Sequence, residues 1–261
     1  MPRIVLVGAG NVATHLSRAL GDDIVAVCSR NIEHARKLAE PIGAQATDDF
    51  SRVAGFSPDI VILSIADNAT DDVVAAIGPI ESRPLVVHTS GTVEKEALLP
   101  LSHRTGVLYP LQSFSVGADV DISEVPFFTE ASDEADYALV DAVARSISPH
   151  VHHADAGHRR VLHIAGVFTN NFPNILLECV EQLLGSAGYP LDVVRPLLKG
   201  TVDKAFALSP HDAQTGPARR GDFDVISRQC NALPDELKPV YKELTALILR
   251  SHNIENEQNR L

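Results

Sequence analysis

The chain has 261 residues, of which 45% are hydrophobic and 21% charged, and its mean hydropathy is close to zero. This composition is typical of a globular protein with a sizeable core and excludes a disordered chain. Residues 1–155 carry 10 Lys and Arg against 22 Asp and Glu, whereas residues 156–261 carry 12 against 12. The negative charge disfavours nucleic acid and anionic membranes as partners, and no run approaches the ~18 apolar residues of a membrane span.

The first apolar run covers only Ile4–Val7, which is too short for the core of a secretory signal peptide. The three cysteines, Cys28, Cys179 and Cys230, are odd in number and far apart. They predict neither a disulfide framework nor a cysteine-based metal site. We therefore expect a cytoplasmic protein.

Short apolar runs, mostly β-branched, alternate with helical segments as far as residue 155. The predicted strands are Ile4–Val7, Ile24–Cys28, Ile60–Ile65, Leu85–His88, Gly106–Tyr109, Pro126–Thr129 and Val151–His153. The predicted helices between them are Val12–Leu20, Ile32–Ile42, Thr70–Ile77, Glu94–Leu101 and Asp133–Ser146. This alternation predicts an α/β fold with a doubly wound, mostly parallel Rossmann sheet.

The pattern after residue 155 is entirely helical. We expect one long helix over 157–187 with a kink at Pro173, and further helices over Pro190–Leu208, Asp222–Leu233 and Pro234–His252, with a loop over 209–221. The sequence thus predicts a dinucleotide-binding domain at 1–155 and an all-helical domain at 156–261 for substrate binding and dimerisation. Apolar stripes on 157–187 and 237–248 predict a homodimer through these helices.

A glycine-rich turn follows the first strand and opens the first helix. Its sequence, Gly8-Ala9-Gly10-Asn11-Val12-Ala13, has the spacing G-x-G-x-x-A. Gly8 permits a tight turn and Gly10 permits close approach of a diphosphate, which would meet the free amides of the helix N-terminus. A glycine turn without a ligand is the alternative. We predict that Gly8, Gly10, Asn11 and Val12 bind a dinucleotide.

The second strand ends without the carboxylate that usually holds a free ribose 2′-hydroxyl. Ser29, Arg30 and Asn31 stand there instead, and their hydroxyl, guanidinium and amide suit a 2′-phosphate. The alternative is an ordinary surface arginine. The sequence therefore favours NADP over NAD.

Three further strand ends carry polar residues that should border the nicotinamide half of the cleft. Ala66 and Asp67 follow one strand and are assigned to the cofactor, although Asp67 could equally cap the next helix. Ser90 and Gly91 follow the next strand, where they either contact the substrate or form a simple turn. Gln112 follows a third strand and is a candidate substrate ligand.

The long helix carries a polar stripe among apolar residues. His163, Asn170 and Asn174 are spaced i, i+7 and i+11, which places them on one helical face. We predict that His163 is a general acid/base, that Asn170 assists it together with Ser90, and that Asn174 binds substrate. A hydrogen-bond network at a domain interface, or a solvated face, is the alternative.

Two other polar segments are candidate ligand sites. His150, His152 and His153 resemble a metal cluster but lack a fourth ligand nearby, so no metal is predicted and their role stays open. The segment Thr215–Asp222 concentrates basic charge among glycines. It either clamps an anionic substrate, with Arg219 as the candidate residue, or only caps the helix that follows.

The glycine turn, the segments His88–Gly91 and Tyr109–Phe114, the helix with His163 and Asn170, and the segment Gln214–Asp222 together resemble a bacterial family described as Rossmann-like with a domain of unknown function 2520. The resemblance covers nearly the whole chain. That family is similar to the 6-phosphogluconate dehydrogenase-like group, which includes pyrroline-5-carboxylate reductase, ketopantoate reductase and deazaflavin-dependent NADP reductases. The resemblance implies an N-terminal NAD(P) domain, a helical C-terminal domain and a dimer.

One departure from the wider group bears on the chemistry. Its hydroxyacid dehydrogenases use a Lys early in the long helix, whereas residues 157–187 contain none here. His163 would then have to supply the proton. We expect an NADP-dependent oxidoreductase acting on a small, anionic carbonyl or imine substrate. The alternative is a non-catalytic NADP-binding sensor or scaffold, which the missing Lys favours.

Overall fold

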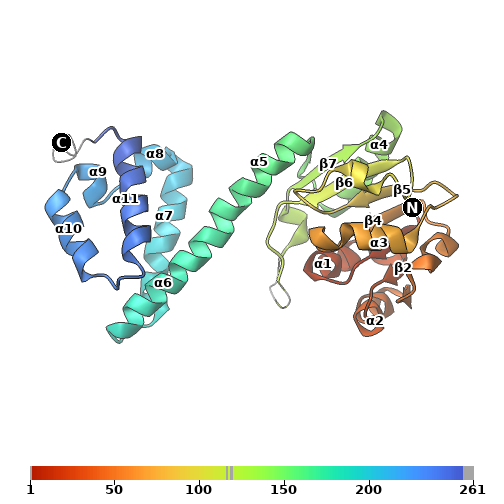
Figure 1. The fold of residues 1–261 in the computed structure, drawn as a ribbon, viewed down its shortest axis with the longest axis horizontal. Coiled ribbons are helices and arrows are strands. Elements are labelled where there is room, and N and C mark those ends of the chain that lie inside the picture. The colour runs from red at the N-terminus through yellow and green to blue at the C-terminus, as the bar shows by residue number, and fades with distance from the viewer. Residues whose placement is uncertain (1, 116, 118–119, 255–261) are drawn as a thin grey trace. The chain divides into compact units, whose positions relative to one another are not determined.

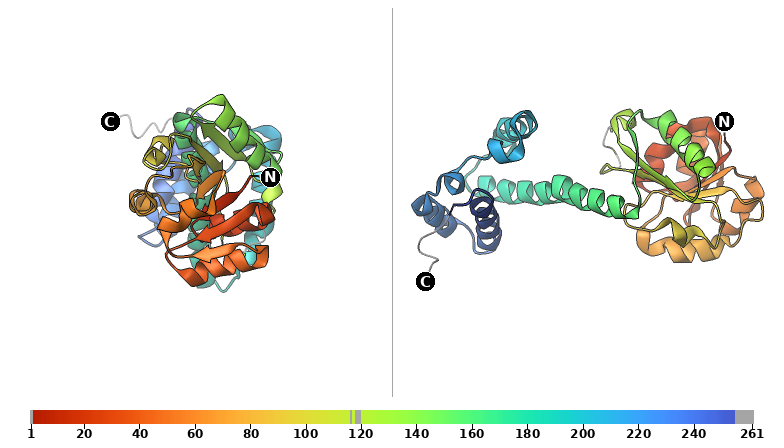
Figure 2. Two further views of the ribbon diagram at one scale, coloured as in Figure 1. Left: turned by 90° about the vertical axis from the view of Figure 1, so that its right-hand side faces the viewer. Right: turned by 90° about the horizontal axis from the view of Figure 1, so that it is seen from above.

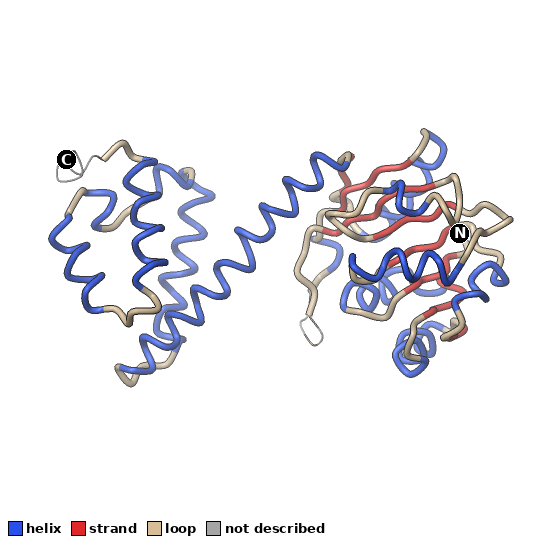
Figure 3. Tube along the Cα trace, in the orientation of Figure 1, coloured by secondary structure: helices blue, strands red, loops and turns tan. Residues whose placement is uncertain are grey.

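The computed structural model describes residues 2–115, 117 and 120–254, and the chain divides into two compact units, Met1–Phe172 and Pro173–Leu261. The first unit combines a sheet with helices, and the described residues of the second are helical with connecting loops (Figure 1, Figure 3). The last strand ends at His153, before the boundary between the two units. The first helix after that strand, α5 (Ala156–Gly166), belongs to the first unit.

One sheet of eight strands organises the first unit, in the order β3-β2-β1-β4-β5-β6-β7-β8. Neighbouring strands are parallel except for β6 and β7. The strands are β1 (Ile4–Val7), β2 (Ile24–Cys28), β3 (Gln45–Thr47), β4 (Ile60–Leu63), β5 (Leu85–His88), β6 (Thr105–Pro110), β7 (Phe127–Ala131) and β8 (Val151–His153). The predicted doubly wound, mostly parallel sheet followed by helices is confirmed, with β3 added.

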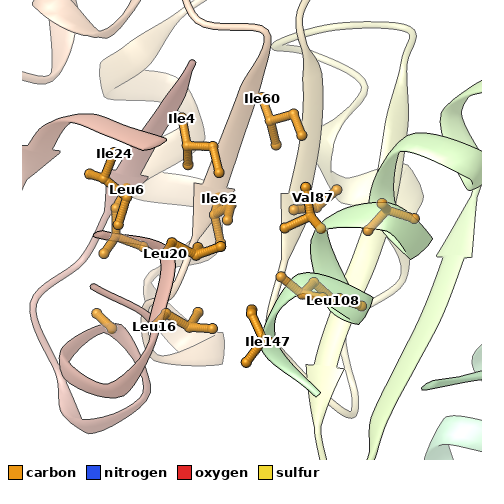
Figure 4. Packing of buried hydrophobic residues seen from close by; sticks show 14 of the residues in the cluster. Ile4, Leu6, Leu16, Leu20, Ile24, Ile60, Ile62, Val87, Leu108 and Ile147 are labelled. Carbon is orange, nitrogen blue, oxygen red and sulfur yellow. The ribbon is translucent and has the colours of Figure 1, made fainter. Parts of the chain in front are cut away.

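The near-continuous apolarity of the strands follows from burial on both faces of the sheet. Successive side chains point to opposite faces, so Ile4 and Leu6 of β1 belong to one core cluster and Val5 and Val7 to the other. The first cluster includes residues of α1 (Asn11–Leu20), α2 (Ile32–Ala39) and α4 (Glu134–Ile147), among them Leu16 and Ile147 (Figure 4). The second includes residues of α3 (Thr70–Ile77) and of nearby 3₁₀ turns. Figure 2 shows helices on either side of the sheet.

The helices of the first unit follow the expected segments, with one correction. They are α1 (Asn11–Leu20), α2 (Ile32–Ala39), α3 (Thr70–Ile77), α4 (Glu134–Ile147) and α5 (Ala156–Gly166). The helix predicted over Glu94–Leu101 is only a 3₁₀ turn over Lys95–Leu98. Pro100 lies where a longer helix would need an amide donor, so the segment cannot continue as a regular helix.

The second unit contains more separate helices than the sequence indicated. Its helices are α6 (Phe172–Ser186), which begins at the last residue of the first unit, α7 (Arg195–Leu208), α8 (Pro210–Ala213), α9 (Pro217–Arg220), α10 (Phe223–Ala232) and α11 (Lys238–Ser251). The loop predicted over 209–221 is wrong in part, because Pro210 and Pro217 each start a one-turn helix.

None of the helices in the described part of the chain is both long and apolar enough to cross a membrane.

A π-helical turn, Val167–Asn171, separates α5 from α6 where the sequence predicted a kinked but continuous α-helix. The amide of Phe172 donates to the carbonyl of Val167, five residues back. Pro173 follows directly and has no amide hydrogen to extend the regular i→i−4 pattern. The wider turn changes the direction of the side chains that follow His163, so an α-helical count along this segment fails.

Candidate functional site

A cavity of about 970 Å³ opens along the carboxyl ends of the strands, and all the residues that line it belong to the first unit. At one end it is lined by the glycine turn and by residues that follow β2. At the other it is lined by the segments after β4, β5 and β6 and by α5 with its π-helical turn. The cavity therefore joins the segments that the sequence assigned to cofactor and to chemistry.

The glycine turn has the geometry that a bound diphosphate needs. Gly8 adopts φ +114°, and a Cβ atom there would lie 2.0 Å from the carbonyl oxygen of Ser64 on the neighbouring strand connection. Gly10 caps α1 without any side-chain hydrogen bond, and a Cβ atom there would meet nothing within 4 Å. The first turn of α1 contains no acidic residue. Its amides and positive dipole thus face the cavity beside Asn11 and Val12.

Of the three residues predicted to bind the 2′-phosphate, Ser29 and Arg30 line the cavity directly after β2, and Asn31 does not. The Asn31 side chain accepts hydrogen bonds from the amides of Glu33 and His34, so it serves as the N-cap of α2. Within the described residues Arg30 forms no ion pair, which leaves its guanidinium available to an anion. His34 also lines the cavity here. The sequence analysis missed it because a lone histidine in a surface helix carries no signal.

The segment after β5 is a tight turn held by side chains. The hydroxyl of Ser90 accepts hydrogen bonds from the amides of Thr92 and Val93, at 3.0 and 3.1 Å, and Ser90 still lines the cavity. Thr92 in turn donates its hydroxyl to the carboxylate of Asp67, which follows β4. Ser90 thus holds the turn and also lines the cavity, and its contact with a substrate stays a prediction. Asp67 and Ala66 line the cavity, and neither caps α3 through its side chain.

His163 on α5 lies at the end of the cavity with Gly91, Gln112 and Asn170. The Nδ1 atom of His163 is 3.5 Å from the hydroxyl of Tyr109, the residue of β6 that the sequence analysis did not select. These side chains come from β6, the turn after β5 and the long helix. The structure therefore brings together the predicted His163, Asn170 and Ser90 around one end of the cavity.

Two predicted substrate residues do not line the cavity. Asn174 lies in the second unit on α6, beyond the π-helical turn, and Asn171 lines the cavity in its place. The regular α-helical spacing that selected Asn174 does not hold across the π-helical turn. Arg219 also belongs to the second unit, where it lies exposed on α9.

The three histidines near β8 have separate partners. The ring of His152 stacks on Phe128 and that of His153 packs edge-on against Tyr137, with ring centroids 5.5 Å apart in both pairs. His150 lies 3.9 Å from a carboxylate oxygen of Glu124. Among the described residues, no group of three or more His, Cys, Asp and Glu side chains is placed to hold a metal ion.

A buried cluster of charged side chains links the turn after β5 to the start of α5. Arg159 is 1% exposed and donates to the carboxylate of Glu130 on β7 and to the backbone carbonyls of Ala154 and Val93. Lys95 forms the second ion pair of Glu130. Because Arg159 precedes His163 by one helical turn, this cluster fixes the helix that carries the candidate acid/base.

Comparison with known proteins agrees with this architecture. A family model described as NADP oxidoreductase, coenzyme F420-dependent, matches residues 3–91, and the domain of unknown function DUF2520 matches residues 125–248. A solved structure of a Bacteroides fragilis protein assigned as an NADP oxidoreductase is 37% identical, with a TM-score of 0.84 over 95% of this chain and 97% of that one. The chain belongs to this Rossmann-like DUF2520 family. The family confirms the predicted resemblance, and its description supports the predicted NADP cofactor.

More distant structures share the fold of this DUF2520 protein. A pyrroline-5-carboxylate reductase from Coxiella burnetii is 14% identical, with a TM-score of 0.59 over 98% of this chain and 99% of that one. An imine reductase from Myxococcus stipitatus, solved with NADP⁺, is 12% identical, with a TM-score of 0.65 over 97% of this chain and 94% of that one. No curated protein matches the chain.

Proposed function

We propose that this protein is an NADP-dependent oxidoreductase that acts on a small, anionic carbonyl or imine compound. The observation that carries the proposal is that one cavity joins Arg30 and the glycine turn to Ser90, His163 and Asn170. One end of the cavity suits a dinucleotide, and the other presents an imidazole, a side chain that can donate or accept a proton. The family description and the NADP-bound imine reductase of similar fold support the same cofactor and chemistry.

The residues at the first end would hold the cofactor. The amides of Gly10, Asn11 and Val12 would receive the diphosphate at the N-terminus of α1. Arg30, with the hydroxyl of Ser29, would bind the 2′-phosphate through charge-assisted hydrogen bonds. His34 and Phe50 also line the cavity and would border the adenine.

The residues at the other end would handle the substrate. Bound NADPH supplies the hydride to the substrate carbon. His163 gives the proton that the substrate nitrogen or oxygen then needs, and in the oxidation direction it accepts that proton. A small polar compound would be oriented by hydrogen bonds from three side-chain carboxamides that line the cavity, those of Gln112, Asn170 and Asn171.

Replacement of His163 tests the catalytic role. We expect His163→Ala to lower the rate of NADPH oxidation with a cognate carbonyl or imine by about 10²–10⁴-fold, the contribution of a general acid, with NADPH affinity unchanged. His158→Ala is the matched control, because His158 lies exposed on the same helix, pairs with Asp155 and does not line the cavity.

A screen of small oxoacids and cyclic imines with NADPH as reductant supplies the substrate for this comparison. The alternative function, a sensor or scaffold that binds NADP without turnover, predicts tight NADPH binding in calorimetry and no oxidation with any member of the screen. Equal turnover of His163→Ala and the parent protein would contradict the proton-donor role directly.

We also propose that the protein works as a homodimer joined through its helices. Within residues 173–254 only Ala213, Ala218 and Cys230 are buried, whereas many large apolar side chains of these helices are exposed. A helical unit of this size with three small buried residues lacks the core that an independent fold requires. A second copy supplies complementary apolar surface, since a twofold interface pairs the same patch on both chains.

A further inference from the structure

Tyr109 is a polar residue of the cavity that the roles above do not use. It lies in β6, its side chain is only 8% exposed, and it lines the cavity. Within the described residues, the only hydrogen-bonding atom within reach of its hydroxyl is Nδ1 of His163, at 3.5 Å. That separation is the outer limit of a hydrogen bond, and catalytic hydrogen bonds are often long before a ligand binds.

Close packing holds the two rings in this arrangement. A Cβ atom on Gly91 would lie 2.8 Å from the Cζ atom of Tyr109 and 3.0 Å from Nδ1 of His163. The backbone of Gly91 therefore fits against both side chains, and only glycine leaves room for them. The ring of Tyr109 also packs on that of Phe128, with centroids 6.4 Å apart. The phenol thus has little freedom to turn away from the imidazole.

The ionisation of Tyr109 suits a neutral hydrogen-bonding partner. Burial, and then the charge of Asp67, raise the pKa of the Tyr109 hydroxyl above its ordinary value of 10.0. The phenol therefore keeps its proton at neutral pH. A protonated hydroxyl has one hydrogen to donate and lone pairs to accept, so it can face either protonation state of an imidazole.

We propose that Tyr109 is a positioning residue for His163: its hydroxyl holds Nδ1, so that Nε2 is the nitrogen that exchanges the proton with the substrate. In the imidazolium, Nδ1–H donates to the phenol oxygen, and Nε2 gives its proton to the substrate nitrogen or oxygen as hydride reaches the carbon. The ring is left neutral and regains a proton from solvent at Nε2. In the resting neutral ring the phenol donates to Nδ1, which places the ring proton on Nε2. This inference rests on the proposed reductase function for its catalytic consequence.

Nuclear magnetic resonance of the full chain tests the contact without any turnover. The ring nitrogens of His163 are assigned by the signals that His163→Ala loses. In the parent protein at high pH we expect the Nε2–H tautomer to dominate. In Tyr109→Phe, which keeps the ring and removes the hydroxyl, we expect a mixture of tautomers. Tyr137→Phe, on α4 and outside the cavity, is the control and should leave His163 unchanged. Identical His163 tautomers in the parent protein and Tyr109→Phe would overturn the proposal.

A kinetic double-mutant cycle tests the consequence for catalysis. We expect Tyr109→Phe to lower kcat by about 10–100-fold with NADPH affinity unchanged, and to lower it by less than about 2-fold when His163 is already alanine, because residues that act as one unit are not additive. The same loss in both backgrounds would show that Tyr109 acts independently of His163. If no compound is turned over, the proposed function fails while the tautomer measurement still decides the role of Tyr109. Gly91→Ala, which crowds both rings, is a second variant and should also alter the His163 tautomer.

Discussion

We predict that one exposed arginine decides between NADP and NAD. Arg30 follows β2, lines the cavity and has no ion-pair partner among the described residues. We expect Arg30→Ala to weaken NADPH binding by about 1.5–3 kcal/mol, the value of hydrogen bonds to a charged group, and to leave NADH binding unchanged. Isothermal titration calorimetry with both cofactors measures the difference. Arg36→Ala is the control, because Arg36 lies exposed on α2, pairs with Glu33 and does not line the cavity.

Parallel losses of NADPH and NADH affinity in Arg30→Ala would show that the residue contacts a part common to both cofactors. In that case Arg30 would not bind the 2′-phosphate.

A buried histidine beneath the turn after β5 links stability to pH. Burial, and then the charge of Arg159, lower the pKa of His88 to about 4, while its Nδ1 atom accepts a hydrogen bond from the amide of Ser90. The unfolded chain therefore binds a proton more readily than the folded one. The associated stability is complete above pH 6.5 and is lost as pH falls from 6.5 toward 4, by at most about 3 kcal/mol.

Urea unfolding of the parent protein and of His88→Gln across this pH range measures that effect. His88→Gln removes the titrating group, so its free energy of unfolding should fall less steeply below pH 6.5 than that of the parent. Equal slopes would mean that His88 does not contribute to acid sensitivity.

At the scale of single elements, two adjacent arginines on α5 differ sharply in environment. Arg159 is fully buried against Glu130, whereas Arg160 forms an exposed ion pair with Glu94. Removal of one partner leaves the other charge buried and poorly compensated, so we expect Arg159→Met to destabilise the protein by about 3 kcal/mol or more. Arg160→Ala should cost at most ~1 kcal/mol, because exposed pairs contribute little. Thermal and urea unfolding compare the two, and similar losses would contradict the structural role of the buried cluster.

Sequence patterns located the elements where local and tertiary preferences agree. The runs Ile4–Val7 and Leu85–His88 are apolar, β-branched in part and buried, and the structure has them as strands with the predicted bounds. Gln45–Thr47 has no apolar run and was missed, because it is a strand only through its pairing with β2. Arg159 was missed as a core residue for a similar reason, since an arginine is buried only where tertiary structure provides its partners.

The sequence predicted several residues of the candidate site and missed others. The glycine turn, Ser90 and His163 follow from spacing and strand ends, and the structure brings them to one cavity. Asn174 was selected by counting along a regular α-helix, which the π-helical turn before Pro173 invalidates. Tyr109 was not selected as a site residue, because a tyrosine at the end of an apolar strand is typical of a core residue until its neighbour on α5 is known.

At the scale of the whole molecule, the sequence indicated a Rossmann part followed by a helical part, and the structure agrees. Sequence patterns do not show which apolar helical surfaces the rest of the same chain leaves exposed. In the described residues, every large exposed apolar side chain except Leu99 lies at position 161 or beyond. The exposed set on the helices includes Leu197, Val202 and Phe206, of which Phe206 is 90% exposed. An apolar surface concentrated in this way marks a site of association.

The proposed homodimer therefore predicts a species of twice the 28.1 kDa chain mass in sedimentation or light scattering at micromolar concentration, with a thermal midpoint that rises with protein concentration.

Phe206→Asp and Leu197→Asp place a charge on the exposed helical surface, and each should shift the protein toward monomer, because burying an unpaired carboxylate costs several kcal/mol. Leu99→Asp is the matched control, since Leu99 is 45% exposed in the first unit. The dissociated variants should also lose helical circular dichroism at lower temperature, because the second unit then keeps only its few small buried residues. A parent protein that sediments as a monomer, or aspartate variants that remain dimeric, would show that another surface or another partner covers these helices.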